Sequence, residues 1–248
     1  MFDSIKSVIT FLTIIPFHRS SIFDIYYIAD RMYLFPLAGA FIGILIGGLG
    51  YEMSFYLQPF LSGFIITAAL MLISGMHHTD ALADFADGLM TKGEKETKHK
   101  AMRDPSVGSA GAAALVLYVA GMIIAISGFH QGVKLLTSMI TAEVTAKYVM
   151  VLQAYTGSPA WEGFSSPFTA AMKDKRKILA ATATTVPLIW FVGSGYAGVF
   201  AFGVSLAIGS IIQYASNKSL GGLSGDVLGA SNEITRLSSL LFLSSVTF

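Results

Sequence analysis

The 40 residues from Ile178 to Asn217 are ILAATATTVPLIWFVGSGYAGVFAFGVSLAIGSIIQYASN, and they contain no charged side chain. A membrane-spanning helix needs about 20 consecutive, mostly apolar residues. This stretch is therefore long enough for two spans, which we expect to be joined by the turn Gly193-Ser-Gly-Tyr-Ala-Gly198. It predicts an all-α protein that crosses the membrane several times.

The composition of the whole chain agrees with a membrane protein. Of its 248 residues 54% are apolar and 12% are charged, whereas a typical soluble domain has about 25% charged residues. The formal net charge of +1 gives no field that would attract nucleic acid, so we expect no nucleic-acid partner. Cysteine is absent, which excludes disulfides, zinc–cysteine sites and a thiol nucleophile.

Hydropathy divides the chain into six firm spans and a weaker seventh within one integral-membrane domain covering residues 1–248. The spans are expected near residues 32–51, 53–76, 105–129, 135–155, 178–194, 198–217 and 234–248. Glycines inside them suit close helix contacts, namely Gly43, Gly47, Gly48, Gly121, Gly203 and Gly209. Residues 1–31 lack a small-residue cleavage site, so they are expected to form an interfacial or re-entrant segment and not a signal peptide.

The basic residues predict the orientation in the bilayer. If the N-terminus is cytoplasmic, the inside loops 1–31, 77–104, 156–177 and 217–233 hold 13 of the 16 Lys and Arg residues, and the outside loops hold only Lys134. Cytoplasmic loops carry such an excess of positive charge. We therefore expect a multi-pass protein of the cytoplasmic membrane whose polar motifs face the cytoplasm.

The segment His77-His-Thr-Asp-Ala-Leu-Ala-Asp-Phe-Ala-Asp-Gly88 follows the second span. Its carboxylates Asp80, Asp84 and Asp87 recur at i, i+4 and i+7, which places them on one face of a helix. Like charges about 6 Å apart repel by about 3 kcal/mol at an effective dielectric near 20. A divalent cation would relieve that repulsion, and carboxylate oxygens suit Mg²⁺, Mn²⁺ or Ca²⁺. The alternative is a solvated acidic turn that favours the helix dipole.

Two polar residues flank this helix. His78 either caps it or binds a phosphate or another part of a substrate. Asp104 precedes Pro105 at the expected start of the third span, where Asp is a common N-cap and Pro a common first helical residue. Asp104 also brings a carboxylate to the membrane surface near the acidic helix, so we retain it as a substrate-binding candidate.

Two further groups carry candidate chemistry. Glu143 and Lys147 form an i, i+4 pair inside the fourth span, which predicts an ion pair facing the bundle interior, with Lys147 a candidate phosphate ligand. The motif from Gly221 to Glu233 combines a glycine-rich loop, whose N–H groups could hold phosphate, with Asp226 and Glu233 on one helix face. A flexible linker with a capping Asp226 is the alternative.

Two acidic faces on the same side of the membrane suggest one shared site for one or two divalent metal ions. Such a site neutralises a diphosphate and stabilises its leaving group, while a carboxylate takes a proton from an attacking hydroxyl. The residues therefore predict phosphoryl transfer at the membrane surface.

Five motifs in order resemble the cobalamin synthase family, the adenosylcobinamide-GDP ribazoletransferases. They are Phe11–Pro16, Phe35–Gly39, His78–Gly88, Asp104–Gly108 and Gly225–Glu233, and they extend over nearly the whole chain. Ala81 stands where the family usually has glycine. The stretch from Lys147 to Phe168 lacks arginines that many bacterial members carry.

The resemblance implies that α-ribazole, or its 5′-phosphate, attacks adenosylcobinamide-GDP, releases GMP and gives adenosylcobalamin or its phosphate. It also implies Mg²⁺ as cofactor. Asp80, Asp84 and Asp87 are then the expected metal ligands, Asp226 and Glu233 the catalytic residues, and His78, Asp104, Lys147 and Gly225 the substrate-binding residues. The lipid bilayer is the expected environment, and a homo-oligomer is left open.

Three other classes share some of these features. A CDP-alcohol phosphotransferase also uses an Asp-rich helix, but it expects an arginine shortly after the Asp-Gly pair, and none follows Gly88 before Arg103. A prenyltransferase with two Asp-rich motifs normally has more spans. A cation-coupled transporter expects acids at mid-span, whereas here only Glu143 lies deep in a span.

Overall fold

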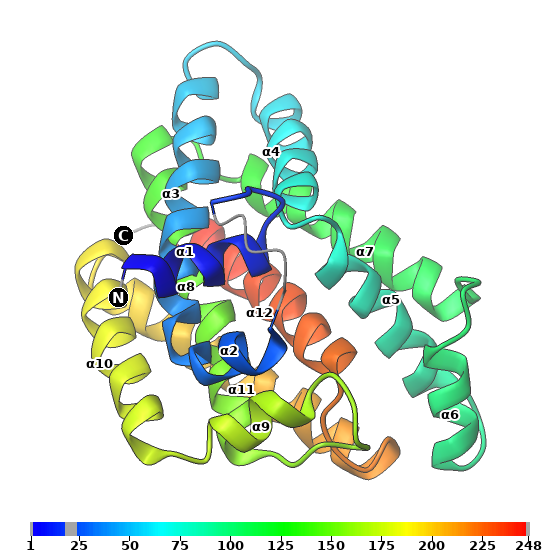
Figure 1. Cartoon of the computed structure of the whole chain (residues 1–248). Helices are drawn as coiled ribbons and strands as arrows, with labels where there is room; N and C mark the ends of the chain where they lie inside the picture. Colours follow the sequence, from blue (N-terminus) through cyan, green and yellow to red (C-terminus); the bar gives the residue numbers. More distant parts are fainter. Residues whose placement is uncertain (1, 18–23, 247–248) are drawn as a thin grey trace.

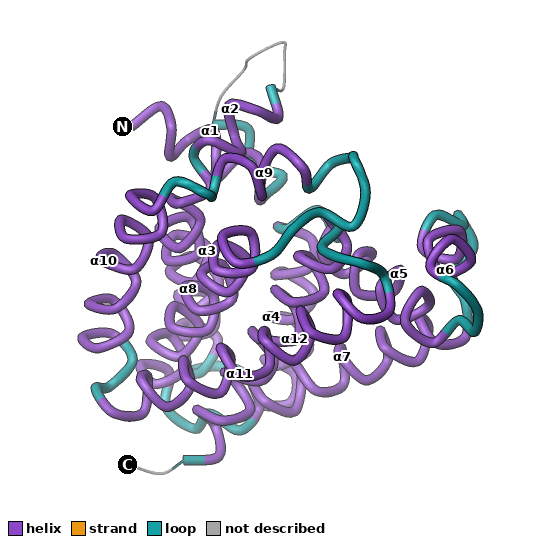
Figure 2. Tube along the Cα trace, turned by 90° about the horizontal axis from the view of Figure 1, so that it is seen from below, coloured by secondary structure: helices purple, strands orange, loops and turns teal. Residues whose placement is uncertain are grey.

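The computed structural model describes residues 2–17 and 24–246 (Figure 1). The described part forms helices and one isolated β-bridge, with no strand (Figure 2). The helices are α1 (Phe2–Leu12), α2 (Ile25–Asp30), the 3₁₀ turn η1 (Met32–Leu34), α3 (Phe35–Met53), α4 (Pro59–Ile73), α5 (His77–Met90), α6 (Lys95–Met102), α7 (Ser109–Ser127), α8 (Gly132–Thr156), α9 (Ser166–Ala171), α10 (Lys175–Val192), α11 (Tyr196–Ser219) and α12 (Gly225–Ser245). The predicted all-α membrane bundle is therefore confirmed.

Four described helical segments are long and apolar enough to cross a membrane, namely Met32–Met53, α7, α8 and α11. Helices α4 and α5 pass only as a pair and are bent by 92°, so they add at most one span. The predicted count of six to seven is not confirmed. Helices α10 and α12 were expected to span but are not among these segments. Helix α10 begins with three basic residues, and α12 contains the charged residues Asp226, Glu233 and Arg236.

The bend between α4 and α5 comes from the backbone at Gly75 and Met76. Both residues have left-handed φ values, +63° and +59°, and an L-residue pays a steric penalty there that glycine avoids. The chain cannot continue α4 through such a turn, so α4 ends at Ile73. Helix α5 starts in a new direction, and we treat it as lying outside the spanning segments.

Helix α8 is the most enclosed of the four spans, with 78% of its apolar stretch buried inside the bundle. Its charged residues Glu143 and Lys147 are 0% and 1% exposed, so they are kept away from lipid. Helix α3 packs along α8 (Figures 1 and 2). The central helix pair α3–α8 supports the elements that carry the polar residues described below.

Glycines set the distance between α3 and α8. Gly39, Gly43 and Gly47 recur every four residues on α3, and a Cβ atom on each would lie within 3 Å of the α8 backbone. Of the other expected contact glycines, Gly121 and Gly209 also pack tightly, against Leu237 and Val149, whereas Gly48 and Gly203 have nothing within 4 Å of an added Cβ atom. Small residues allow such close helix approach in membranes.

We therefore expect Gly43→Ala to lower the melting temperature of the detergent-solubilised protein by several degrees. A Cβ atom at position 43 would lie 2.5 Å from the Ile140 Cα atom, so the two backbones would have to separate. Gly48→Ala in the same helix is the matched control, because its added methyl group meets no atom and alanine favours the helix. Equal melting temperatures for the two variants would contradict this packing.

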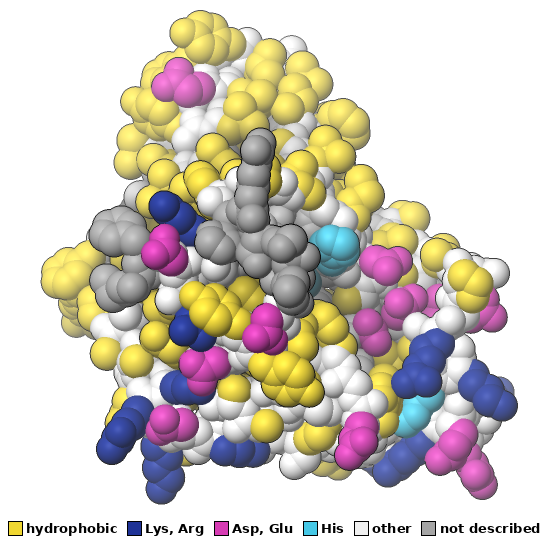
Figure 3. All heavy atoms as spheres, viewed as in Figure 1, with side chains coloured by type: hydrophobic (Ala, Val, Ile, Leu, Met, Phe, Trp, Pro, Cys, Tyr) yellow, Lys and Arg dark blue, Asp and Glu magenta, His cyan; other side chains and the backbone are white. Residues whose placement is uncertain are grey.

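Lys and Arg side chains gather along one edge of the molecule, where α6 lies and where α10 begins (Figure 3). The opposite tip, formed by α3 and α4, is mostly hydrophobic (Figures 1 and 3). This asymmetry is the arrangement that the basic loops predicted from the sequence.

Candidate active site

The three aspartates of the acidic motif all lie on α5, as predicted. Helix α5 packs against α7 and α12, and Figure 3 shows acidic side chains gathered over it. The two helices α5 and α12 approach closely at Ala81 and Gly229, where a Cβ atom on Gly229 would lie 2.6 Å from that of Ala81. Small residues at this crossing bring the acidic face of α5 beside the N-terminal end of α12, where Asp226 lies.

Asp87 is tied to the backbone of the next helix. Its Oδ2 atom accepts a hydrogen bond from the Gly108 N–H at 2.8 Å, and its Oδ1 atom accepts one from the Gly111 N–H at 2.9 Å. These N–H groups belong to the first turn of α7, where no partner exists within the helix and the dipole favours negative charge. Asp87 thus caps α7 from another helix.

The expected N-cap of the third span was therefore wrong. Helix α7 begins at Ser109 with Gly108 as N-cap, and Asp104 accepts a hydrogen bond from the Ser106 N–H in a local turn, at 2.9 Å. The physical reason is that Asp87 already supplies the carboxylate that the helix end requires. The substrate-binding role of Asp104 stays a prediction.

The hydrogen bonds to the start of α7 distinguish Asp87 from Asp80. We expect Asp87→Asn to lower the melting temperature by several degrees, because an amide offers one acceptor where two are needed and removes the charge. Asp80→Asn is the matched control, because Asp80 is exposed and its side chain makes no hydrogen bond to a described residue. Thermal unfolding in detergent compares the two, and a larger loss in Asp80→Asn would contradict the cap.

Asp84 and Asp226 form the acidic centre between α5 and α12. Burial, together with the negative charges of Asp80, Asp226 and Asp87, raises the pKa of Asp84 to about 6. Burial also raises the pKa of Asp226. A hydrogen bond from Ser224 lowers this pKa in part, whereas the negative charge of Asp80 raises it further. These carboxylates repel one another, and no ion pair among the described residues involves Asp80, Asp84 or Asp226.

Uncompensated carboxylates are the donor set that a hard divalent cation prefers. Across residues 2–17 and 24–246, no three His, Asp or Glu groups are already close enough together to hold a metal ion. The carboxylates therefore fit such an ion in chemistry, and their side chains would have to rotate towards it.

The glycine-rich loop is folded against the loop between α8 and α9. Gly221 and Gly222 have positive φ values, and the Leu223 N–H donates to the Ser158 carbonyl at 2.8 Å. The Gly221 N–H donates to Ser216 at 3.0 Å. These two N–H groups are used inside the fold, so the expectation that they are free to hold phosphate was wrong for them.

A cavity of about 730 Å³ lies beside the acidic centre. Five of its lining residues are aromatic, namely Phe11, Phe35, Trp161, Phe164 and Phe168. Among the described residues, the lining contains one acidic side chain, Asp226, and one arginine, Arg103. Gly225 and His78 also line the cavity. The cavity thus joins an apolar aromatic chamber to one of the predicted catalytic residues, in a size range typical of small-molecule sites.

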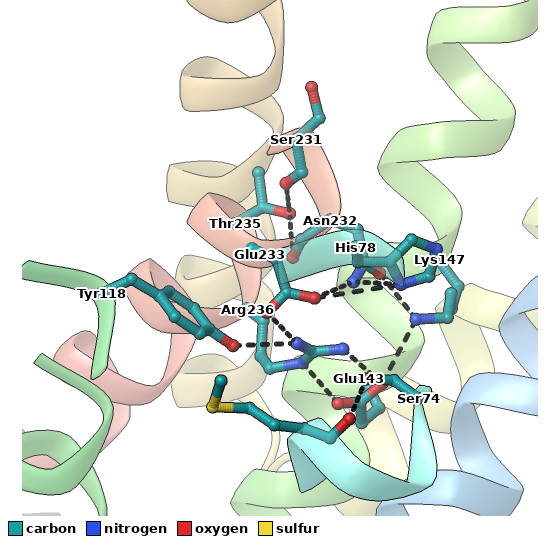
Figure 4. Close-up of polar contacts among 11 residues, drawn as sticks. Ser74, His78, Tyr118, Glu143, Lys147, Ser231, Asn232, Glu233, Thr235 and Arg236 are labelled. Carbon is teal, nitrogen blue, oxygen red and sulfur yellow. Dashed lines mark hydrogen bonds and ion pairs between the residues drawn. The ribbon is translucent and has the colours of Figure 1, made fainter. Parts of the chain in front are cut away.

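A second polar group lies in the bundle interior (Figure 4). Arg236 of α12 donates to Glu143 of α8 and to Glu233, each at 2.5 Å, and to the Tyr118 hydroxyl at 3.0 Å. Lys147 pairs with Glu143 at 3.5 Å, which confirms the predicted i, i+4 ion pair. Two acids and two bases balance their charges, as buried ionic groups require.

His78 connects this interior group to the cavity. Its Nδ1 atom lies 3.2 Å from the Asn232 amide nitrogen, and the Asn232 oxygen accepts from Lys147 at 2.6 Å. Burial, then the positive charges of Lys147 and Arg236, hold the pKa of His78 well below its usual value. The neutral imidazole can therefore accept the Asn232 N–H.

The predicted site residues thus divide into two groups. Asp226, Gly225 and His78 line the cavity, and Asp80 and Asp84 of α5 lie within electrostatic range of Asp226. Glu233 and Lys147 are each 1% exposed and belong to the interior ionic group. Their predicted catalytic and phosphate-binding roles are not tested by this placement.

Residues that the sequence did not single out are Arg236, Asn232, Tyr118 and the aromatic lining of the cavity. Arg236 had a visible signal, because Glu233 and Arg236 form a second acid–base pair at i, i+3 near an apolar stretch. Two acid–base pairs in two mostly apolar helices favour one shared network. The aromatic lining comes from three parts of the chain, at Phe11, at Phe35 and at residues 161–168, and no local pattern joins them.

Comparison with known proteins shows the family of this chain. The family model described as cobalamin-5-phosphate synthase matches residues 4–244. The chain belongs to the cobalamin-5-phosphate synthase family. The resemblance carried by the five motifs is thereby confirmed.

Relatives in this family match along nearly their full length. The adenosylcobinamide-GDP ribazoletransferase of Methanocella arvoryzae is 29% identical, over 97% of this chain and 94% of its own. The enzyme of the same name from Pyrococcus furiosus is 32% identical, over 96% of this chain and 98% of its own. That from Archaeoglobus fulgidus is 28% identical, over 97% and 96%. No solved structure matches this cobalamin-5-phosphate synthase family member.

Proposed function

We propose that this membrane protein joins adenosylcobinamide-GDP to α-ribazole, or to α-ribazole 5′-phosphate, and releases GMP. The observation that carries the chemistry is the packing of α5 on α12, which brings Asp80 and Asp84 within electrostatic range of Asp226 beside the cavity. Family membership supplies the substrates. The proposed membrane is the cytoplasmic one, with this site on its cytoplasmic side.

The proposed metal ligands are Asp80, Asp84 and Asp87, with Asp226 as a further ligand or as the base. When bound there, Mg²⁺ supplies positive charge that offsets the diphosphate and the leaving GMP. Asp87 would contribute while it also caps α7, because each carboxylate oxygen can accept more than one interaction.

The transfer exchanges one phosphorus–oxygen bond for another. A ribose hydroxyl of the acceptor bonds to the cobinamide-linked phosphorus, and the bond from that phosphorus to the bridging oxygen of GMP breaks. Asp226 takes the hydroxyl proton; its raised pKa makes it a better base than an ordinary aspartate. Glu233, held by Arg236, would act through His78 and Asn232 on the shape of the cavity wall.

The test is release of GMP from purified protein mixed with Mg²⁺, adenosylcobinamide-GDP and α-ribazole. We expect release that requires all three components and is accompanied by a cobalamin product. Replacing α-ribazole by its 5′-phosphate distinguishes the two acceptors. Release without an acceptor, or none with either, would contradict the proposal.

A further inference from the structure

Four phenylalanine rings gather in the cavity wall, from three parts of the chain that are far apart in sequence. Phe11 lies in α1, Phe35 in α3, Phe168 in α9, and Phe164 in the loop before α9. The Phe11 ring centroid lies 6.0 Å from that of Phe35, 6.2 Å from Phe164 and 5.8 Å from Phe168. These contacts form one aromatic cluster, defined by the four rings, at distances typical of favourable ring pairs.

One member of the aromatic cluster keeps an open face. Phe164 is 58% exposed, although it stacks on Phe11 with an interplanar angle of 14°. A large exposed ring in a cavity wall offers a surface on which a planar group can stack.

The same ring lies beside the catalytic helix end. A Cβ atom built on Gly225 would lie 3.2 Å from the Phe164 Cδ1 atom. Asp226, the proposed base, is the next residue and lines the same cavity. A planar base stacked on Phe164 would therefore carry its attached sugar towards the Asp226 carboxylate.

The polarity of the wall selects the kind of base. The Thr13 hydroxyl donates to the Ile9 carbonyl at 2.7 Å, and the Ser165 hydroxyl donates to Leu223 at 3.0 Å. These two hydroxyls already donate within the fold, and the phenylalanine rings of the aromatic cluster offer no hydrogen-bond partner to a polar base edge. Guanine carries several donors and acceptors that would lose hydrogen bonds to water against these rings, whereas the methylated benzimidazole of α-ribazole has an apolar edge.

We propose that the aromatic cluster is the binding site for the benzimidazole base of the acceptor nucleoside, with Phe164 as its stacking platform beside Asp226. This inference rests on the proposed function, because that function supplies the acceptor. The guanine nucleotide is then assigned to another part of the protein, because its polar base edge does not suit the aromatic cluster. The corrinoid is also assigned elsewhere, because the corrin ring is much larger than a nucleoside.

Binding can be followed without catalysis, because the chain has two tryptophans and Trp161 lines the cavity. In a Trp190→Phe background, we expect α-ribazole to change Trp161 fluorescence in the detergent-solubilised protein. Phe164→Leu should weaken the apparent affinity about tenfold, the size expected for loss of one base-stacking contact. Phe164→Tyr keeps a ring and should retain the affinity. Phe191→Leu, an 82% exposed ring on α10, is the control outside the cavity.

Steady-state kinetics separates the two substrates. Phe164→Leu should raise KM for α-ribazole about tenfold and leave KM for adenosylcobinamide-GDP unchanged. The inference is overturned if GMP or GDP changes Trp161 fluorescence at lower concentration than α-ribazole, or if Phe164→Leu binds α-ribazole as the parent does. If the parent protein releases no GMP, the proposed function is overturned instead. The fluorescence titration would still test whether α-ribazole binds at the aromatic cluster.

Discussion

Arg236→Met is expected to destabilise the folded protein more than any of the other proposed substitutions. Arg236 is 1% exposed and donates hydrogen bonds to Glu143, Glu233 and Tyr118. Without it, Lys147 is the one remaining buried base for two buried carboxylates in this group. Breaking a buried ion pair by removing one partner costs about 3–5 kcal/mol. We therefore expect the melting temperature in detergent to fall by roughly 10 °C.

A double variant distinguishes loss of charge balance from loss of packing. Glu233→Met combined with Arg236→Met leaves Glu143 paired with Lys147 and restores neutrality. We expect it to be more stable than Arg236→Met alone, which gives a measurable coupling between the two positions. A double variant less stable than the single one would show that charge balance is not what holds this group together.

Asp84→Asn is expected to lower GMP release by roughly 10³-fold, the scale on which enzymes lose rate when one essential electrostatic group is removed. Asp84 lies at the centre of the acidic face, where its pKa is raised by burial and by three other carboxylates. The variant should insert and purify normally, because Asp84 takes part in no ion pair. Glu52→Gln, an exposed acid at the end of α3, is the charge control.

The same substitution should change stability in opposite directions with and without metal. The folded-state pKa of Asp84 is about 6, above its ordinary 3.8, so its ionised form destabilises the folded protein. Without metal, the wild type should lose stability as pH rises from about 4 through 6, and Asp84→Asn should lose less, since the raised pKa of Asp226 still contributes. The variant should then melt a few degrees higher at pH 8, an effect kept small by solvent screening.

With Mg²⁺ the order should reverse, because a ligand that binds only the folded state stabilises it. The wild type should gain melting temperature on addition of Mg²⁺ above about pH 6, where Asp84 is ionised, and Asp84→Asn should gain little. Melting curves at pH 5 and pH 8, with Mg²⁺ or with a chelator, give all four comparisons. An equal Mg²⁺ response in the two proteins would remove Asp84 from the metal site.

Local sequence patterns predicted the structural features that depend only on residues close together in the chain. Mostly apolar stretches of sufficient length marked α3, α7, α8 and α11 as spans, because bilayer thickness sets that length. The boundary of α4 was missed, since the left-handed turn at Gly75 and Met76 shortens it. A hydropathy pattern contains no signal for such a turn.

The sequence by itself determined the membrane bundle, the helical face of Asp80, Asp84 and Asp87, and the Glu143–Lys147 pair, because these follow from periodicity within one helix. Only the tertiary structure decided the partners across helices. Asp87 caps a helix that begins 22 residues later, and Arg236 pairs with Glu143, 93 residues away. The aromatic cluster likewise comes from three distant parts of the chain. Such contacts depend on how far the helices approach and at what angle, which small residues such as Gly43 and Gly229 set, and no local spacing encodes that geometry.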